Sequence, residues 1–465
     1  MTTTSLKKGQ NIMPMISITI LFFMWGFITS LNDILIPFLK EIYSLSHFEA
    51  NIVQFAFFIA YFVGAFAFYI LSLKKKDPIS KWGYKTTIVI GLVISSIACS
   101  LFAFAAYKAL SFSIFLCTLF CLGLGLTFLQ IAANPFVAII GEPQTASSRL
   151  NLSQAFNSLG TTLGPALGGY LIFTMFKPEE NQGPSTVVIP YLVLAGLLLL
   201  VAIFIYFSKI NTTIEEETSV SKKTSIWSKP YTILGALGIF FYVGAEVAVG
   251  SNIVSYLKEN YNMEESLASA YLSYYWGGAM IGRFLGSVSL SNLKIEKKLL
   301  YMLLLAATGF AVIFFINNSL HGLSFEKVWI FLLFIALNFV GLFIGKGKTA
   351  RSLAIFAFVN VCLIVLSLSI NSPLVIWTLL AIGLFNSIMW SNVFTLAIDG
   401  LKEQTSQVSS MLIMMIVGGA VLPPLQGLLA DATNISISFL IPMVSYAYLF
   451  SYGIKGFNIG KISSK

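Results

Sequence analysis

Long apolar runs alternate with short polar segments along the whole chain. Each run has roughly the 20 residues that a helix needs to cross a bilayer, and the sequence contains fourteen of them. The runs lie near residues 15–38, 49–72, 86–107, 111–140, 152–175, 188–207, 230–257, 267–290, 299–316, 327–345, 351–370, 373–398, 408–430 and 437–454. The pattern predicts an all-α integral membrane protein with 14 transmembrane helices.

The second half of the chain repeats the first. Three small residues of the fifth run recur at one constant spacing in the thirteenth, where Gly160, Pro165 and Gly169 match Gly418, Pro423 and Gly427. Earlier in the halves the spacing is smaller by roughly 40 residues, which is about two crossings with their turns. Two parallel bundles of six helices are the plan of major facilitator transporters, which bind substrate near the middle of the membrane between the halves.

We therefore predict a major facilitator fold with a two-helix insert in its second half. The first six-helix bundle covers 1–207, and the long polar stretch at 208–230 is a cytoplasmic linker. The second bundle covers 231–465 and contains the insert within about 299–370.

Composition and charge agree with a membrane protein. The chain is 57% hydrophobic and 10% charged, with a mean hydropathy of +0.86, which is more apolar surface than a soluble fold can hide. Only five of the 28 Lys and Arg residues fall on the outer side if the N-terminus is cytoplasmic: Lys40, Lys108, Lys177, Lys258 and Lys327. This asymmetry predicts that both termini are cytoplasmic and explains the net charge of +9 without a nucleic-acid partner.

Residues for enzyme chemistry are scarce. The four cysteines all lie in apolar runs, and the two histidines, His47 and His321, fall in predicted outer loops. Neither a nucleophile triad nor a metal cluster can be built from them, and no glycine-rich phosphate loop precedes a helix. We therefore expect no enzyme activity, no metal site and no cofactor.

Two carboxylates fall at membrane depth. Asp33 is the only charge between Met15 and Lys40, and Glu246 lies in the segment FFYVGAEVAVGSN of the seventh run. Neither has an Arg or Lys within its own span. A carboxylate without a cation in low dielectric can bind and release a proton near neutral pH, which makes both candidates for proton coupling. The alternatives are a structural carboxyl tied to a neighbouring helix or, for Glu246, direct binding of sugar hydroxyls.

Carboxamides form the second candidate set. Gln130 and Asn134 are spaced i, i+4, and Gln154 and Asn157 are spaced i, i+3, so each pair shares a helical face. Amides offer donors and acceptors to an uncharged, hydroxyl-rich ligand. The predicted substrate-binding residues are Asn32, Gln54, Gln130, Gln154, Asn157, Tyr275, Asn386 and Trp390, the last lying i+4 from Asn386 as an aromatic platform. The alternative is that these amides tie helices together.

A further group of residues is predicted to serve structure or gating. The segment GTTLGPALGG, from Gly160 to Gly169, permits close helix approach and bending, and it also fits a pattern associated with drug/proton antiporters. Arg149 and Arg283 are placed at cytoplasmic span ends as anchors or gates, with no substrate role. This group comprises Asn134, Pro135, Arg149, Gly160, Pro165, Arg283 and Pro423, where Asn134 can satisfy backbone freed by Pro135.

Several long segments resemble the bacterial glucose/galactose transporters of the fucose–galactose–glucose:proton symporter family. They are FFMWGFITSLNDILIP, LQIAANPF, SSRLNLSQAFNSLGTTLGP, GALGIFFYVGAEVAVGS, YYWGGAMIGRFLGS and MIVGGAVLPPLQG. The resemblance implies that Asp33 is the proton-site aspartate and that Gln154 and Asn157 line the sugar cavity. It also implies a multi-pass protein of the bacterial cytoplasmic (inner) membrane.

Three positions depart from the fucose symporter. Gln130 stands where that symporter has a glutamate, Glu246 stands where it has a glutamine, and Trp390 replaces a smaller aromatic residue. The resemblance therefore implies one carboxylate in each half and leaves the preferred sugar open.

The expected function is proton-coupled uptake of a neutral hexose by alternating access. Its partners are a small-molecule sugar and the lipid bilayer, and we expect the protein to work as a monomer. The alternatives are sodium coupling with the same sugar, a drug/proton antiporter, and a transporter-like receptor without net flux. The extra helix pair argues against an exporter, because fourteen-span drug exporters carry theirs between the halves.

Overall fold

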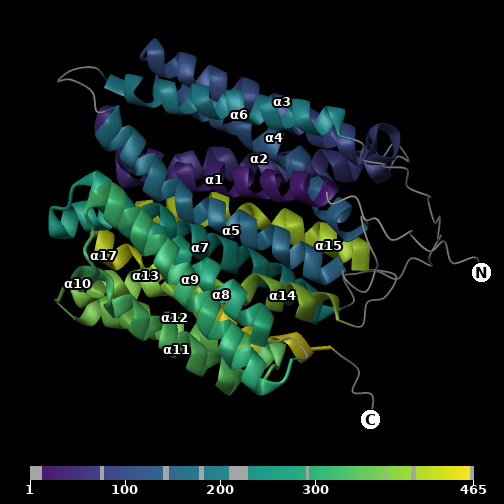
Figure 1. Cartoon of the computed structure of the whole chain (residues 1–465), viewed down its shortest axis with the longest axis vertical. Helices are drawn as coiled ribbons and strands as arrows, with labels where there is room; N and C mark the ends of the chain where they lie inside the picture. The colour runs from purple at the N-terminus through teal and green to yellow at the C-terminus, as the bar shows by residue number, and fades with distance from the viewer. Residues whose placement is uncertain are drawn as a thin grey trace, which may run out of the picture.

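The computed structural model describes residues 13–73, 78–139, 146–176, 183–208, 229–289, 293–370, 372–399 and 405–460. Long helices run side by side through the molecule (Figure 1). The first half contains α1 (Met13–Ile42), α2 (His47–Leu73), α3 (Pro78–Tyr107), α4 (Phe112–Ile139), α5 (Ala146–Tyr170) and α6 (Val188–Phe207). The segment Leu171–Met175 continues α5 as a π-helical turn.

The second half contains more helices, several of which join end to end. They are α7 (Pro230–Tyr261), α8 (Glu265–Ser289), α9 (Ile295–His321), α10 (Phe325–Val328), α11 (Ile330–Gly345), α12 (Thr349–Ser369), α13 (Leu374–Asn386), α14 (Met389–Ile398), α15 (Thr405–Met414), α16 (Gly418–Ala432), α17 (Ile435–Ser438) and α18 (Leu440–Ile454).

The predicted number of membrane crossings is confirmed for the described residues. Twelve helices or end-to-end pairs of helices are long and apolar enough to cross a membrane. The 25-residue helices α5 and α8 bring the number of crossings to fourteen. Both are less apolar because they pack against each other between the halves, so they carry polar residues where other helices meet lipid.

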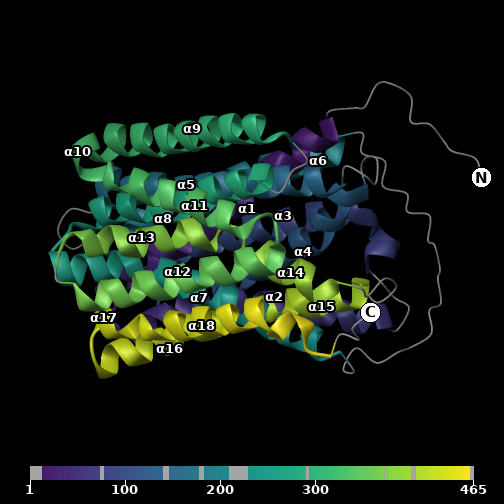
Figure 2. The ribbon, with the colours of Figure 1, turned by 90° about the horizontal axis from the view of Figure 1, so that it is seen from below.

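The two halves are visible in Figure 1 as a purple-to-blue group and a green-to-yellow group. Helix α1 packs closely against α5, and α2 and α5 of the first half pack against α16 and α8 of the second. Helix α1 begins and α18 ends at one end of the bundle. The short helices α10 and α17 lie at the opposite end, called the distal end from here on (Figures 1 and 2).

The packing indicates which helices form the added pair. Helix α12 packs against α13 and α18, just as α3 packs against α4 and α6 in the first half. We infer that α12 takes the place of α3 in the repeat and that α9 and α10–α11 are the insert. The domain boundaries remain predictions, and linker residues 209–228 lie outside the described part of the chain.

Helix α9 of the insert contacts both halves. It packs along α8 and also touches α5 of the first half (Figure 2). At its distal end His321 Nε2 lies 3.0 Å from the carbonyl oxygen of Ala166, and its Nδ1 lies 3.1 Å from Ser266 Oγ. A carbonyl oxygen only accepts, so Nε2 carries the hydrogen and Nδ1 of the neutral ring accepts from the serine hydroxyl. The insert therefore joins α9, α8 and α5 at this end.

The distal end is closed by charged residues from both halves. Lys40 Nζ of α1 lies 2.8 Å from Glu259 Oε1 of α7. Lys258 Nζ of α7 lies 2.7 Å from both Glu41 Oε2 of α1 and Glu265 Oε1 of α8. Exposed ion pairs contribute little stability singly, but together these fix the two halves against each other at one end.

The glycine repeat predicted from the sequence corresponds to two equivalent close contacts. A Cβ atom at Gly160 of α5 would overlap the carbonyl oxygen of Phe23 in α1. In the second half, a Cβ at Gly418 of α16 would overlap the carbonyl oxygen of Phe240 in α7. Both positions require a residue without a side chain, because the helix backbones meet there.

We predict that Gly160→Ala lowers the apparent melting temperature of the detergent-solubilised protein by at least about 3 °C, because overpacking a helix contact typically destabilises by 1–3 kcal/mol. The control is Gly196→Ala on α6, where an added Cβ meets no atom within 4 Å. Equal melting temperatures for the two variants would contradict the close contact.

Candidate functional site

Asp33 lies in the middle of α1 and is held by three hydrogen-bond donors. Its side chain is buried at the contact between the halves. Gln54 Nε2 of α2 donates to Oδ1 at 2.9 Å, Ser251 Oγ of α7 donates to the same oxygen at 3.1 Å, and Trp276 Nε1 of α8 donates to Oδ2 at 2.9 Å. Among the described residues no Lys or Arg forms an ion pair with Asp33. The carboxyl group is thus bound by neutral donors from both halves.

Glu246 is different, because a cation reaches it from the next helix. Arg283 Nη2 of α8 lies 3.4 Å from Glu246 Oε1, and Tyr242 OH donates to the same oxygen at 2.7 Å. Arg283 Nη1 also donates to Ser158 Oγ of α5. The expectation that Glu246 lacks a cation is therefore wrong, and Arg283, which is predicted to anchor or gate, pairs with it and contacts the other half. The sequence argument failed because it considered cations only within each span.

Two amide residues of α5 are only partly buried. The side chains of Gln154 and Asn157 are half-buried, and Asn157 Nδ2 donates to the carbonyl oxygen of Phe22 in α1 at 3.0 Å. Gln130 of α4 and Arg283 of α8 are half-buried as well. Among the predicted polar side chains that the structure describes, these four remain partly exposed while the distal end is closed.

A family model described as the Major Facilitator Superfamily matches residues 18–350, more than half of the chain. The chain belongs to the Major Facilitator Superfamily. It is therefore a transporter and not an enzyme, as the sequence predicted.

Relatives within the superfamily share nearly the whole chain. The glucose/galactose transporter of Brucella abortus is 39% identical over 98% of this chain and 96% of its own. The L-fucose-proton symporter of Escherichia coli is 27% identical over 96% of this chain and 93% of its own.

Solved structures show the same fold. A crystal structure of the Escherichia coli fucose:proton symporter superposes with a TM-score of 0.62 at 26% identity, covering 96% of this chain and 99% of that one. An inward-facing bacterial homologue of the human lysosomal transporter Spinster reaches 0.65 at 13% identity, covering 99% and 100% of the two chains. The latter likeness concerns the fold alone.

In this transporter Asn386 lies inside the second half and faces no open space. Its Nδ2 donates to Tyr275 OH at 2.9 Å, and its Oδ1 accepts from Asn360 Nδ2 at 2.9 Å. Tyr275 OH in turn donates to the carbonyl oxygen of Glu246 at 2.7 Å. Both Asn386 and Tyr275 are fully buried, which favours the alternative reading of helix-to-helix ties over contact with substrate.

Trp390 does not form a platform beside Asn386. Helix α13 ends at Asn386 and α14 begins at Met389, so the i, i+4 argument does not apply across this break. The indole instead stacks on Phe394, with ring centroids 5.1 Å apart and an interplanar angle of 18°.

The remaining predicted residues lie on α1, α4, α5 and α16. Asn32 is fully buried, and neither its Oδ1 nor its Nδ2 has a hydrogen-bond partner in the described structure. The side chains of Asn134, Pro135 and Arg149 lie outside the described part of the chain. Pro165 and Pro423 lie inside α5 and α16, the two helices of the glycine contacts.

Sequence reasoning missed the residues that complete both carboxylate sites. Ser251 and Trp276 reach Asp33 from the opposite half, Tyr242 reaches Glu246 from another turn of the same helix, and Ser158 contacts Arg283, the partner of Glu246. The available signal was that all four residues lie in segments that carry the family resemblance.

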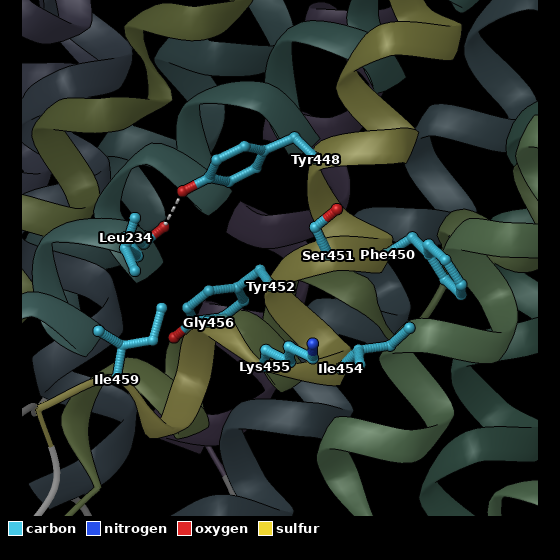
Figure 3. Close-up of a pocket in the computed structure, with 9 residues that line it drawn as sticks. All are labelled: Leu234, Tyr448, Phe450, Ser451, Tyr452, Ile454, Lys455, Gly456 and Ile459. Carbon is cyan, nitrogen blue, oxygen red and sulfur yellow. Dashed lines mark hydrogen bonds between the residues drawn. The ribbon is translucent and has the colours of Figure 1, made fainter.

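A hollow of about 400 Å³ lies elsewhere, at the end of the bundle opposite the distal end (Figure 3). It is formed by Leu234 of α7 and by residues 448–459, and Tyr448 OH donates to the carbonyl oxygen of Leu234 at 2.8 Å. Its lining includes none of the predicted substrate or coupling residues, so we assign it no part in transport.

We predict that Glu246 and Arg283 are energetically coupled. Removing one partner leaves the other as a buried charge without its partner. The destabilisations caused by Arg283→Met and by Glu246→Gln should therefore add up to more than the destabilisation of the double variant, by roughly 2 kcal/mol. Denaturation of the purified protein measures it. The exposed pair Glu41–Lys258 is the control and should couple by less than about 1 kcal/mol. Equal couplings would contradict a buried Glu246–Arg283 pair.

Proposed function

We propose that this transporter carries a neutral hexose into a bacterial cell together with a proton. The observation that carries the proposal is Asp33, a buried carboxyl group that forms no ion pair with any described residue and is held between the two halves by neutral donors. Such a group can accept a proton without breaking a salt bridge. The names of the relatives, a glucose/galactose transporter and fucose-proton symporters, support both the sugar and the ion.

The proposed orientation follows from the distribution of positive charge. With both termini in the cytoplasm of the cell and the protein in the cytoplasmic (inner) membrane, the distal end faces outward. The ion pairs Lys40–Glu259 and Lys258–Glu41 then close the outer side, and the described conformation is one from which ligands leave inward. We propose that a single chain carries out the cycle.

The half-buried amides supply a suitable place for the sugar. Gln130, Gln154 and Asn157 lie on α4 and α5 of the first half, and Arg283 reaches the same region from α8. The amides offer both donors and acceptors to hydroxyl groups, which also act as both, and Arg283 adds donors. We propose that the sugar bridges these residues and that the halves rock around it, since repeats of this kind move largely as rigid bodies.

We predict that Asp33→Asn abolishes uphill accumulation, because an amide cannot carry the proton. In proteoliposomes with an imposed pH gradient, the variant should bring labelled glucose or galactose only to an inside-to-outside ratio near unity. Counterflow of the same sugar should persist. Concentrative uptake by the variant would contradict the proposal.

The same vesicles separate the alternatives. Uptake that depends on a sodium gradient and is unaffected by a protonophore would show that the coupling ion is Na⁺ and not the proton. Counterflow absent for glucose, galactose, fucose and N-acetylglucosamine would contradict a hexose substrate. Efflux of amphipathic cations driven by the pH gradient would favour the antiporter.

A further inference from the structure

Two of the three donors to Asp33 come from the opposite half of the protein. Gln54 lies on α2 of the first half, beside α1, and stays with Asp33 whenever that half moves as a unit. Ser251 and Trp276 lie on α7 and α8 of the second half. Their contacts with Asp33 therefore exist only in a particular arrangement of the two halves.

The contacts lie on the distal side of the bundle. At 1.5 Å per helical residue, Asp33 lies about 14 Å from the distal end of α1, Ser251 about 15 Å from that of α7, and Trp276 about 17 Å from that of α8. The ion pairs Lys40–Glu259 and Lys258–Glu41 hold these same helices together beyond the site. Opening the distal end must separate α1 from α7 and α8, which removes both donors from Asp33.

We propose that Ser251 and Trp276 are positioning residues that couple closure of the distal end to release of the proton from Asp33. This inference rests on the proposed function. When the distal end closes, the Ser251 hydroxyl and the Trp276 indole N–H replace water as donors to the carboxylate. Burial on closure disfavours the ionised form, and these two donors counter this effect, because hydrogen bonds to a charged acceptor are stronger than those to a neutral one. The Asp33 O–H bond then breaks, the electron pair stays on the carboxylate, and the proton passes to water on the open side.

The structure also contains an acceptor for the neutral form. Gln54 Oε1 is buried without a partner in the described structure, while Gln54 Nε2 donates to Asp33 and also to Ser251 Oγ at 2.9 Å. Rotation of this amide would let Oε1 accept from a protonated Asp33. The site can thus satisfy the carboxyl group before and after release, and only Ser251 and Trp276 depend on closure.

Several other ionisable groups lie on the helices that surround Asp33. Glu246 of α7 and Tyr275 of α8 are close enough to interact with it electrostatically, and Glu246 is paired with Arg283. On α1 and α2, and at the distal ends of α7 and α8, the charged side chains are Lys40, Glu41, His47, Glu49, Lys258, Glu259, Glu264 and Glu265. Helices α4 and α6 carry no charged residue, and α5 carries only Arg149, whose side chain lies outside the described residues.

Two transport modes distinguish release of the proton from the other steps. Equilibrium exchange of labelled sugar needs no net proton movement, because the loaded carrier shuttles back and forth. Uptake driven by a pH gradient requires the proton to leave on the inner side in every cycle. A defect in release alone therefore lowers driven uptake and spares exchange.

We predict that Trp276→Phe, which keeps an aromatic ring but removes the N–H, lowers pH-gradient-driven uptake of glucose or galactose by about tenfold at neutral internal pH. Equilibrium exchange should stay within about twofold of the parent protein, and driven uptake should recover when the internal pH is raised by about one unit. Ser251→Ala should show the same split more weakly, and Ser251→Thr, which keeps the hydroxyl, should restore driven uptake.

Trp377→Phe is the matched control. Trp377 is an equally buried tryptophan of the second half, packed among Tyr271, Tyr274 and Phe331 away from Asp33. It should leave the ratio of driven uptake to exchange unchanged. If Trp276→Phe does not fold, the Ser251 pair of variants carries the test alone.

Loss of exchange and driven uptake in equal proportion, or no change in either, would overturn the proposal. So would a defect that internal pH does not relieve. If the parent protein shows exchange but no uptake driven by a pH gradient, the proposed function is contradicted. That result comes from the parent protein alone and is distinct from a failure of the inference about Ser251 and Trp276.

Discussion

The hydrogen bonds that meet at Asp33 join the two halves at the depth where a charge is hardest to accommodate. An isolated carboxylate there would be unstable, so α2, α7 and α8 must each bring a donor to within hydrogen-bond distance of α1. The glycine contact that brings α5 against α1, with its counterpart between α16 and α7, keeps both central helices where these donors can converge. Helix packing and the chemistry of one side chain thus depend on each other.

The two buried carboxylates differ in how their charge is balanced. Glu246 has the guanidinium of Arg283 within the same half, and relative motion of the halves need not separate the two. Within the described part of the chain, each donor to Asp33 is neutral, and two of the three belong to the opposite half. A permanently paired carboxylate suits ligand binding and structure, whereas one whose partners change with conformation suits an exchangeable proton. The environment, and not the residue type, distinguishes the two carboxylates.

The sequence was sufficient for those features that lie along one helix. Hydrophobic runs predicted fourteen crossings, and the recurrence of Gly160 at Gly418 corresponds to two equivalent backbone contacts. The single charge in the first run marked Asp33 as a candidate. Features that join different helices were not predictable, because no spacing links Glu246 to Arg283 or Asp33 to Trp276. Trp390 shows that a prediction along one helix can also fail. Its predicted place beside Asn386 assumed an unbroken helix, but α13 ends at Asn386.

The insert adds a contact whose two sides are constrained differently. His321 must keep its imidazole to donate from Nε2, but its acceptor at position 166 is a backbone oxygen that every amino acid possesses. Substitutions at 166 that preserve the helix leave the acceptor in place, so this hydrogen bond does not itself restrict the residue there, and only the burial of Ala166 limits the size of the side chain. Only the insert side of this contact needs a particular side chain, and the first half could have acquired such a partner without changing its own sequence.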